Sequence, residues 1–364
     1  MCPARHDRRW LTRVVAATAT GLAFTLGGCD AVAHRPGMTS GTPGFAVEAG
    51  AAASRLQSWY GVRKYRTRWW QSATSLEAAI EYMRASGSRA YISDLDRTYQ
   101  AFHRGGFLNR YYDDEGWWAL AWIAAYQLTR DGHFLRQAKD IFANMTTGWD
   151  STCGGGIWWS KRRTYKNAIA NELFLDIAAR LHNLTPGDRA YLTWADREWT
   201  WFAASGMLTG SHLVVDGLAG CRAKLGSPTW TYNQGILIGG LAELSDATHD
   251  ASLLGTARAT ANAVINSSKL SPRGILREPC EPSSCGRDAP TFKGIFIENL
   301  KLIDERAPNA NYEDYMRRNA AAVWRSDRRG DGFGLHWDGP FDHADTARQA
   351  AALDVLTTQI APDA

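Results

Sequence analysis

The chain has 364 residues, of which 45% are hydrophobic and 21% charged, a composition typical of a folded globular protein. Lysine and arginine number 41 against 37 aspartates and glutamates, and residues 1–29 hold four of these arginines and one aspartate. The remainder therefore carries 37 basic and 36 acidic residues, which disfavours a nucleic-acid-binding protein. The 16 tryptophans are more than a core needs, and their flat faces suit the apolar faces of sugar rings.

The first 29 residues have the pattern of an export signal. Four arginines precede an apolar stretch over residues 14–26, which is too short to span a bilayer and is followed by Gly27-Gly28-Cys29. The ending resembles a bacterial lipobox, which implies cleavage before Cys29 and lipid on its thiol. The alternative is an ordinary signal with a coincidental cysteine.

These features predict the cellular location. We expect a signal peptide over residues 1–28, followed by a flexible tether over 29–48 that is rich in Gly, Pro, Ser and Ala. The protein is then exported and lies on the outer face of the cytoplasmic membrane or on the cell surface. We expect the lipid on Cys29 to be its only contact with the membrane.

From residue 49 onward the chain reads as helical almost throughout. Apolar residues recur at three- and four-residue spacing, while period-2 runs typical of strands are nearly absent. The predicted helices cover 72–86, 92–102, 115–129, 133–145, 164–182, 189–205, 234–246, 251–267, 292–304, 312–325 and 344–357. No linker interrupts them, so the sequence predicts a single all-α domain over 49–364. Helical hairpins can close into a ring, although periodicity alone does not establish closure.

Four cysteines remain beyond the signal region: Cys153, Cys221, Cys280 and Cys285. An even number in an exported chain favours disulfides, and three pairings are possible. Cys280 and Cys285 are close enough in sequence to close a small ring, which would leave Cys153 with Cys221. Zinc is the alternative, but neither spacing is C-x2-C and no histidine lies nearby in sequence, so we expect no metal.

Chemistry is most concentrated in the run from Tyr111 to Ile123, which contains Asp113-Asp114-Glu115 before a tryptophan-rich segment. One interpretation is structural, because acidic residues in the first turn of a helix complement its dipole. The other is a glycosidase pair, in which one carboxylic acid protonates the leaving oxygen and the other carboxylate attacks the sugar. Neighbouring residues can bring two carboxyl groups to the separation of about 5–5.5 Å that retaining enzymes use.

This run resembles the signature of glycoside hydrolase family 76, the endo-α-1,6-mannanases. Further motifs agree in order over about residues 50–357: Trp69-Trp70-Gln71-Ser72, Cys153-Gly154-Gly155-Gly156-Ile157-Trp158-Trp159, 166–174, Asp216-Gly217-Leu218, Thr231-Tyr232-Asn233-Gln234-Gly235, 292–296 and 349–354. The resemblance implies an (α/α)6 barrel and hydrolysis of α-1,6-mannosidic bonds with retention, through a covalent glycosyl-enzyme. By motif position, it implies that Asp113 is the nucleophile and Asp114 the general acid/base.

Substrate-binding residues are expected in the same motifs. Asp216 matches an acidic position of the family that is expected to contact the sugar next to the cleaved bond, and the alternative is an Asx-turn before Gly217. The other expected binding residues are Trp70, Trp117, Trp118, Trp158, Tyr232 and Asn233. Core packing is the alternative for each tryptophan.

The sequence departs from the family pattern at Ile297-Glu298-Asn299, where many relatives have a basic residue, and after Cys221, so the preferred mannan stays open. Two other functions are also compatible with the sequence. The same site serves a transglycosylase that remodels cell-envelope glycan, or the chain is a mannan-binding lipoprotein without turnover. In every case we expect a monomer whose partner is α-1,6-mannan or a mannose-containing glycan, with no cofactor and no nucleic acid.

Overall fold

The structure is a computed structural model that describes residues 44–185 and 187–361. The predicted signal peptide, Cys29 and most of the predicted tether lie outside these residues. The described helices are α1 (Phe45–Gln57), α2 (Trp69–Ser86), α3 (Ile92–Phe102), α4 (Tyr112–Thr129), α5 (Gly132–Thr146), α6 (Ala168–Leu184), α7 (Arg189–Ala204), α8 (Thr231–Thr248), α9 (Ala251–Ile265), α10 (Phe292–Arg306), α11 (Ala310–Ser326) and α12 (Thr346–Thr357).

Short elements decorate the loops. Two small antiparallel ladders pair β1 (Leu218–Ala219) with β2 (Arg222–Ala223) and β3 (Arg328–Arg329) with β4 (Gly332–Phe333). Single 3-10 turns cover His103–Gly105, Thr152–Gly154, Pro272–Gly274 and Ala289–Thr291. None of the described helices is long and apolar enough to cross a lipid bilayer.

All eleven predicted helices are present as α2 to α12, with ends that differ by a few residues. The largest shift is at α6, which begins at Ala168 because the Asn167 side chain caps it by accepting from the Ala170 N–H. Helix α1 begins at Phe45, inside the segment predicted as tether. Phe45 and Ala49 are buried, so this part of the chain already belongs to the domain.

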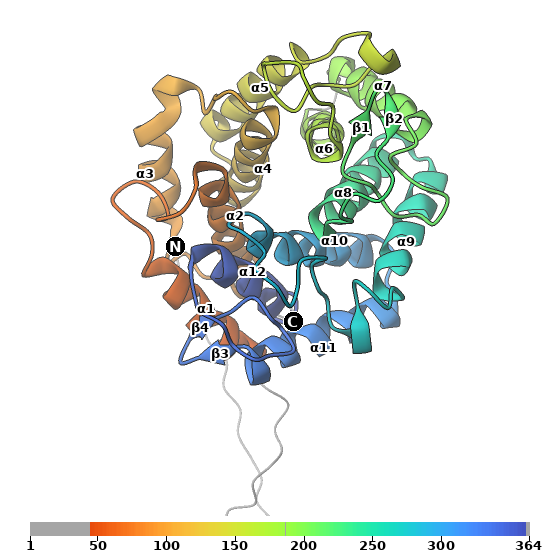
Figure 1. Cartoon of the computed structure of the whole chain (residues 1–364). Coiled ribbons are helices and arrows are strands. Elements are labelled where there is room, and N and C mark those ends of the chain that lie inside the picture. The colour runs from red at the N-terminus through yellow and green to blue at the C-terminus, as the bar shows by residue number, and fades with distance from the viewer. Residues whose placement is uncertain (1–43, 186, 362–364) are drawn as a thin grey trace, which may run out of the picture. The chain divides into compact units, whose positions relative to one another are not determined.

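The helices form two concentric layers around one axis (Figure 1). The even-numbered helices α2, α4, α6, α8, α10 and α12 contact one another in this order, and α12 contacts α2, which closes the inner ring. They are buried over most of their length, whereas the odd-numbered helices bury one face and form the outer layer. The chain thus folds as an (α/α)6 barrel, as predicted.

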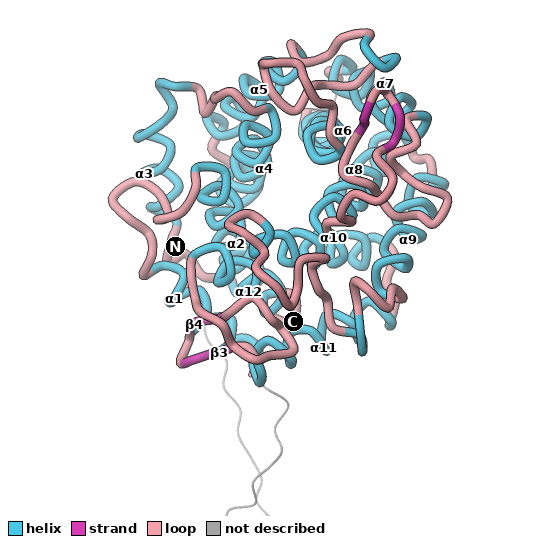
Figure 2. The backbone as a smooth tube through the Cα atoms, in the orientation of Figure 1, coloured by secondary structure: helices cyan, strands magenta, loops and turns pink. Residues whose placement is uncertain are grey.

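The six inner helices run in the same direction, and their N-termini meet at one end of the barrel. Trp70 at the start of α2 stacks on Trp117 of α4, and Tyr232 of α8 stacks on Phe292 of α10. The long connections belong to this end, including those between α5 and α6 and between α7 and α8 (Figure 2). This end therefore combines helix N-termini with loops, an arrangement that attracts anionic groups.

The loop between α5 and α6 is organised around the buried side chain of Lys166. Its Nζ donates to the carbonyl oxygens of Thr152, Gly155 and Gly156 at 2.6–2.9 Å, and to the Asp150 carboxylate at 3.0 Å. These acceptors surround the ammonium group and compensate for its burial. Lys166 thus fixes the glycine-rich turn that precedes Trp158 and Trp159.

Two disulfides close loops at the same end. Cys153 pairs with Cys221 and Cys280 pairs with Cys285, which is the pairing in which the nearest two cysteines close a small ring. The first bond ties the glycine-rich turn to the β1–β2 ladder. The disulfide prediction is confirmed for all four cysteines.

Gly156 provides a test of this loop. It has a φ of +80°, and a Cβ on it would overlap the ring of Trp201, which is almost fully buried. We expect Gly156→Ala to lower the free energy of unfolding by about 3 kcal/mol or more, because both backbone strain and overpacking oppose it. Chemical denaturation followed by tryptophan fluorescence measures the change.

Gly330 is the matched control. It also has a positive φ, of +58°, but a Cβ there meets nothing within 4 Å. Gly330→Ala should therefore cost only about 1 kcal/mol, the left-handed backbone penalty alone. Equal losses for the two variants would contradict the packing argument.

Candidate active site

The acidic pair lies in the first turn of α4, at the end of the barrel where the inner helices begin. Tyr111 is the N-cap in an extended conformation and offers no side-chain cap. Asp113 and Asp114 are both partly exposed, while Glu115 beside them is fully buried. The unpaired N–H groups and the dipole of α4 favour negative charge here. The position of these acids therefore fits the structural interpretation.

Asp113 is held by an indole from the α5–α6 loop. Trp159 Nε1 donates to Asp113 Oδ2 at 2.8 Å, and the Trp159 carbonyl accepts from the Tyr112 N–H at 2.9 Å. A bridge between Tyr111 and Ser160 continues this backbone contact. The other oxygen, Asp113 Oδ1, is buried without a partner among the described groups. The indole N–H of Trp159, which can donate but not accept, thus fixes one oxygen of the carboxylate.

Asp114 is held from the other side by Asn109. The Asn109 Nδ2 donates to Asp114 Oδ2 at 2.6 Å, and the Asn109 Oδ1 accepts from the Tyr111 N–H at 2.6 Å. The Asn109 N–H donates to Glu115 Oε1, which also pairs with Lys161 at 2.7 Å. Glu115 is thus an anchor for the turn before α4, and Asn109 orients Asp114.

Burial raises the pKa of both carboxyl groups of the pair. It raises the pKa of Asp113 to about 8, with the negative charge of Asp114 as the second cause and the Trp159 hydrogen bond in opposition. It raises the pKa of Asp114 to about 6, opposed mainly by the Asn109 hydrogen bond. Because the two groups interact, they titrate as a pair. Near pH 7 the pair holds about one proton, so it offers an acid and a carboxylate side by side.

An aromatic wall stands next to the pair. Trp117 stacks on Trp70 with ring centroids 5.7 Å apart and on Tyr232 at 6.3 Å, and Tyr232 stacks on Phe292 at 3.8 Å. Trp70 also donates from Nε1 to Asp288 at 3.2 Å. Trp70 and Trp117 are 9% and 3% exposed, so they mainly support the wall, and Tyr232 is its more accessible ring.

The prediction that Trp118 lines a sugar subsite is wrong. Trp118 has no exposed surface and packs against Trp69, Phe107 and Trp122, with ring centroids 4.9–5.7 Å away. Neighbouring residues on a helix point in directions about 100° apart, so Trp117 and Trp118 face different surroundings. Trp118 is a core side chain.

Trp158 and Asn233 occupy contrasting places. Trp158 is partly exposed, donates from Nε1 to Asp150 Oδ2 at 2.7 Å and has the Lys166 ammonium 4.8 Å from its ring. Asn233 is fully buried, and its side-chain oxygen and nitrogen both lack a partner among the described groups. Trp158 is accessible to a ligand, whereas Asn233 lies beneath the surface.

Asp216 and Asp113 both lie near Tyr232. Its Oδ2 accepts from the Tyr165 hydroxyl at 2.8 Å, and its charge, with that of Asp113, contributes to the strongly raised pKa of Tyr232, of which burial is the main cause. The Leu218 N–H donates to the Lys166 carbonyl, not to Asp216. The alternative of an Asx-turn therefore does not hold, and the carboxylate faces other side chains.

Three site residues were not singled out from the sequence. Asn109 donates to Asp114, five residues along the chain. Trp159 donates to Asp113 and Tyr165 donates to Asp216, across 46 and 51 residues. Trp159 stood in a recognised motif, and indole donors often seek a partner when buried. Among the described residues, no group of three or more His, Cys, Asp or Glu is arranged to hold a metal ion.

Comparison with known proteins decides the family. The model of glycosyl hydrolase family 76 matches residues 50–364, which is most of the chain. The chain is a member of glycosyl hydrolase family 76. It is therefore a glycoside hydrolase, and the acidic pair lies inside the matched region.

Named relatives of this family 76 protein are fungal. It is 31% identical to a mannan endo-1,6-alpha-mannosidase of Candida albicans over 54% of its length and 47% of the relative, so it spans about half of that protein. It is 27% identical to a mannan endo-1,6-alpha-mannosidase of Saccharomyces cerevisiae over 81% of its own length and 72% of the relative.

Solved structures of the family share the fold. An inactive variant of an alpha-1,6-mannanase of Salegentibacter sp. HEL1_6, in complex with alpha-1,6-mannotriose, matches with a TM-score of 0.79, 21% identity and coverage of 87% of this chain and 99% of that one. In that variant two consecutive aspartates are replaced by asparagine. A fungal family structure from Chaetomium thermophilum in complex with glucosamine matches with a TM-score of 0.75, 21% identity and coverage of 88% and 92%.

The raised pKa values of the pair predict a pH-dependent cost to stability. A carboxyl whose folded-state pKa exceeds its unfolded value stabilises the fold when protonated and loses this contribution as pH rises through the folded pKa. We expect Asp113→Asn to be more stable than the wild type at pH 8, by on the order of 1–3 kcal/mol, and equal to it near pH 4. Thermal or chemical unfolding at both pH values measures this.

Asp331→Asn is the control, because Asp331 is an exposed aspartate away from the pair. It should change stability little at either pH. If Asp113→Asn gave the same difference from the wild type at pH 4 and pH 8, the buried-pair interpretation would fail.

Proposed function

We propose that this family 76 enzyme is an endo-acting α-1,6-mannanase, which cleaves bonds within mannan-type polysaccharide. The observation that carries the proposal is the Asp113-Asp114 pair at the start of α4, with separate donors from Trp159 and Asn109. Support comes from the names of its relatives and from the mannanase whose variant lacks two consecutive aspartates and is inactive.

The proposed mechanism is a double displacement with retention. Asp113 attacks the anomeric carbon of the α-mannoside while Asp114 protonates the departing oxygen, which leaves a β-linked mannosyl ester on Asp113. Asp114 then removes a proton from water, which attacks the anomeric carbon, breaks its bond to the Asp113 oxygen and leaves an α-configured mannose at the new end, with Asp113 again a carboxylate. Trp159 Nε1 contributes by donating to the Asp113 carboxylate, which stabilises its charge before attack and as it leaves.

The pair shares about one proton near neutral pH, because burial raises the pKa of both carboxyl groups and the charge of Asp114 adds to the effect on Asp113. Attack requires Asp113 as the anion and Asp114 as the acid. We propose that substrate selects this arrangement of the proton. A sugar that covers Asp114 removes water from it and places an acceptor oxygen beside it, and both effects favour protonated Asp114.

The accessible aromatic ring and the third acid complete the proposed site. Tyr232 offers a partly exposed face close to Asp113, and Asp216 is oriented by Tyr165. We propose that Asp216 accepts hydroxyl hydrogens of the sugar next to the cleaved bond, and that Tyr232 and Trp158 pack against the sugar chain. Trp70 and Trp117 would act behind Tyr232 by holding its ring in place.

Azide, as an external nucleophile, distinguishes the nucleophile from the general acid/base. We expect Asp113→Ala and Asp114→Ala to lower kcat on linear α-1,6-mannan by about 1,000-fold or more. On an aryl α-mannoside or α-1,6-mannobioside with a good leaving group, azide should rescue both variants. Asp114→Ala should give the α-mannosyl azide, because azide replaces water in the second step, and Asp113→Ala the β-mannosyl azide by direct displacement. Proton NMR of the products assigns each role.

Exchanged azide products would reverse the roles of the two acids. Asp331→Asn, an exposed aspartate, serves as the matched control and should keep wild-type turnover. Full activity of either alanine variant on mannan would remove that residue from the mechanism. Release of new reducing ends from linear but not from branched mannan would show that the enzyme requires an unbranched chain.

We also propose that the protein is exported and anchored by lipid on Cys29, as its sequence indicates. In a bacterial host that processes lipoproteins, the full chain should label with palmitate and partition into the detergent phase of a Triton X-114 extraction. Cys29→Ser should lose both properties while it keeps mannanase activity. A Cys29→Ser protein that still labels and stays in the detergent phase would contradict the anchor.

A further inference from the structure

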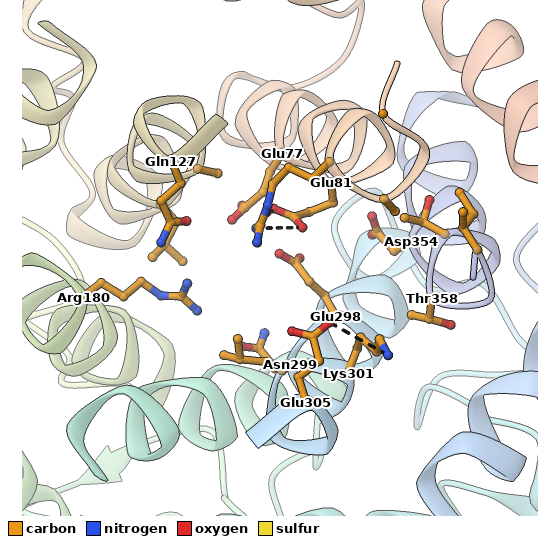
Figure 3. A pocket seen from close by; sticks show the side chains of 18 residues that line it. Glu77, Glu81, Gln127, Arg180, Glu298, Asn299, Lys301, Glu305, Asp354 and Thr358 are labelled. Atoms are coloured by element: carbon orange, nitrogen blue, oxygen red, sulfur yellow. Dashed lines mark hydrogen bonds and ion pairs between the residues drawn. The ribbon is translucent and has the colours of Figure 1, made fainter. Parts of the chain in front are cut away.

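A cavity of about 410 Å³ lies among the C-terminal halves of the inner helices (Figure 3). α2, α4, α6, α10 and α12 contribute Glu77, Gln127, Arg180, Glu298 and Asp354 to its walls. Gln127 is about 20 Å along the α4 axis from Asp113, so the cavity opens toward the other end of the barrel from the acidic pair. Its volume is within the range of ligand sites.

The walls of this basal cavity carry an excess of acidic groups. Five acids and three basic residues line it. Arg84 is paired with Glu81 at 2.8 Å, and Arg180 with Asp176 at 2.7 Å. The remaining base, Lys301, lies 3.9 Å from Glu305.

Three carboxyl groups of the basal cavity lack a direct partner, although the charge of Arg180 acts on Glu77 and Glu298 and that of Arg84 acts on Glu298. Glu77, Glu298 and Asp354 have no hydrogen-bond or ion-pair partner for their side chains among the described residues. Figure 3 shows Glu77 and Glu298 directed into the open space, with Asp354 at its edge. These three acids give the cavity a centre that becomes negative when they ionise.

Two further observations favour a positively charged occupant. The cavity narrows inward into a space lined by Asp176, a fully buried residue whose Oδ2 has no partner among the described groups. In addition, the C-cap residues Gly87 of α2 and Thr358 of α12 line the cavity, so helix C-termini with their partial negative charge surround it.

The rest of the lining indicates the chemical class of the ligand. Leu120, Ala124, Leu302 and Ile360 provide an aliphatic wall. Among the described residues no Trp, Tyr or Phe lines the main cavity, and Trp117 lines only its narrow inward end, so a sugar ring in the main cavity finds no stacking face. The acids are not arranged to hold a metal ion within the described residues. We propose that the basal cavity binds an aliphatic diamine or polyamine, whose methylene chain packs on the aliphatic wall and whose ammonium groups pair with the three carboxyls.

A cation would change the protonation of these acids. Burial raises the pKa of Glu298 to about 8 and that of Glu77 and Asp354 well above the usual range; the charges of neighbouring acids add to this effect, and the charge of Arg180 opposes it at Glu77 and Glu298. A bound ammonium group offsets both causes, because it supplies the opposite charge that lets the carboxyls ionise. The binding is independent of the proposed mannanase activity.

Isothermal titration of the full chain with 1,5-diaminopentane tests the proposal. We expect saturable binding of one molecule, no binding of 1,5-pentanediol, and at least a tenfold weaker affinity in Glu298→Gln. Glu77→Gln should weaken binding in the same way, which guards against a folding defect in one variant, and circular dichroism checks both. Glu313→Gln, an exposed glutamate on α11 outside the cavity, should bind as the wild type does.

The variant Asp113→Asn tests whether the diamine binds in the basal cavity or at the acidic pair. We expect it to bind the diamine unchanged, because Asp113 lies at the other end of the barrel. Binding lost in Asp113→Asn, binding unaltered in both glutamine variants, or equal binding of the diol would each overturn the proposal. Displacement of the diamine by α-1,6-mannobiose would also overturn it, since it would assign the cavity to sugar.

Discussion

Two adjacent carboxyl groups at the start of a buried helix are the constraint on which the site depends. Neighbouring acids at one helix N-terminus cannot both ionise freely when burial removes water from them. The fold supplies each with a separate donor, Trp159 for Asp113 and Asn109 for Asp114, from loops on opposite sides of the turn. Lys166 also supports this arrangement, because its hydrogen bonds fix the turn that precedes Trp159.

The fold was accessible from the sequence because apolar residues recur at helical spacing and turn residues separate one helix from the next. Even α8, which is buried over most of its length, is bounded by turn residues that mark it as a separate element. The start of α1 could not be predicted from the sequence. Gly44 and the residues before it have a linker composition, and only the burial of Phe45 against the barrel extends the domain to that point.

The sequence predicted part of the site. It could predict the residues that are neighbours in sequence, but not the contacts between residues far apart in sequence. The acids Asp113 and Asp114 are neighbours in sequence, so their proximity required no tertiary information. Trp118 was assigned wrongly because α4 is apolar on every side, and sequence cannot tell which face of such a helix meets the core. Trp159 reaches Asp113 across 46 residues, a contact that only the folded chain defines.

The parallel direction of the inner helices gives the barrel two electrically different ends. Where α4 begins, free N–H groups favour the carboxylate that a glycosyl transfer needs, and loops have room to supply donors. Where α2 and α12 end, carbonyl groups add to the charge of Glu77, Glu298 and Asp354, so the same helix direction disfavours anions there. A neutral sugar is indifferent to this field, whereas an ammonium group is not. The polarity of one ring of helices therefore separates sugar chemistry at one end from cation binding at the other.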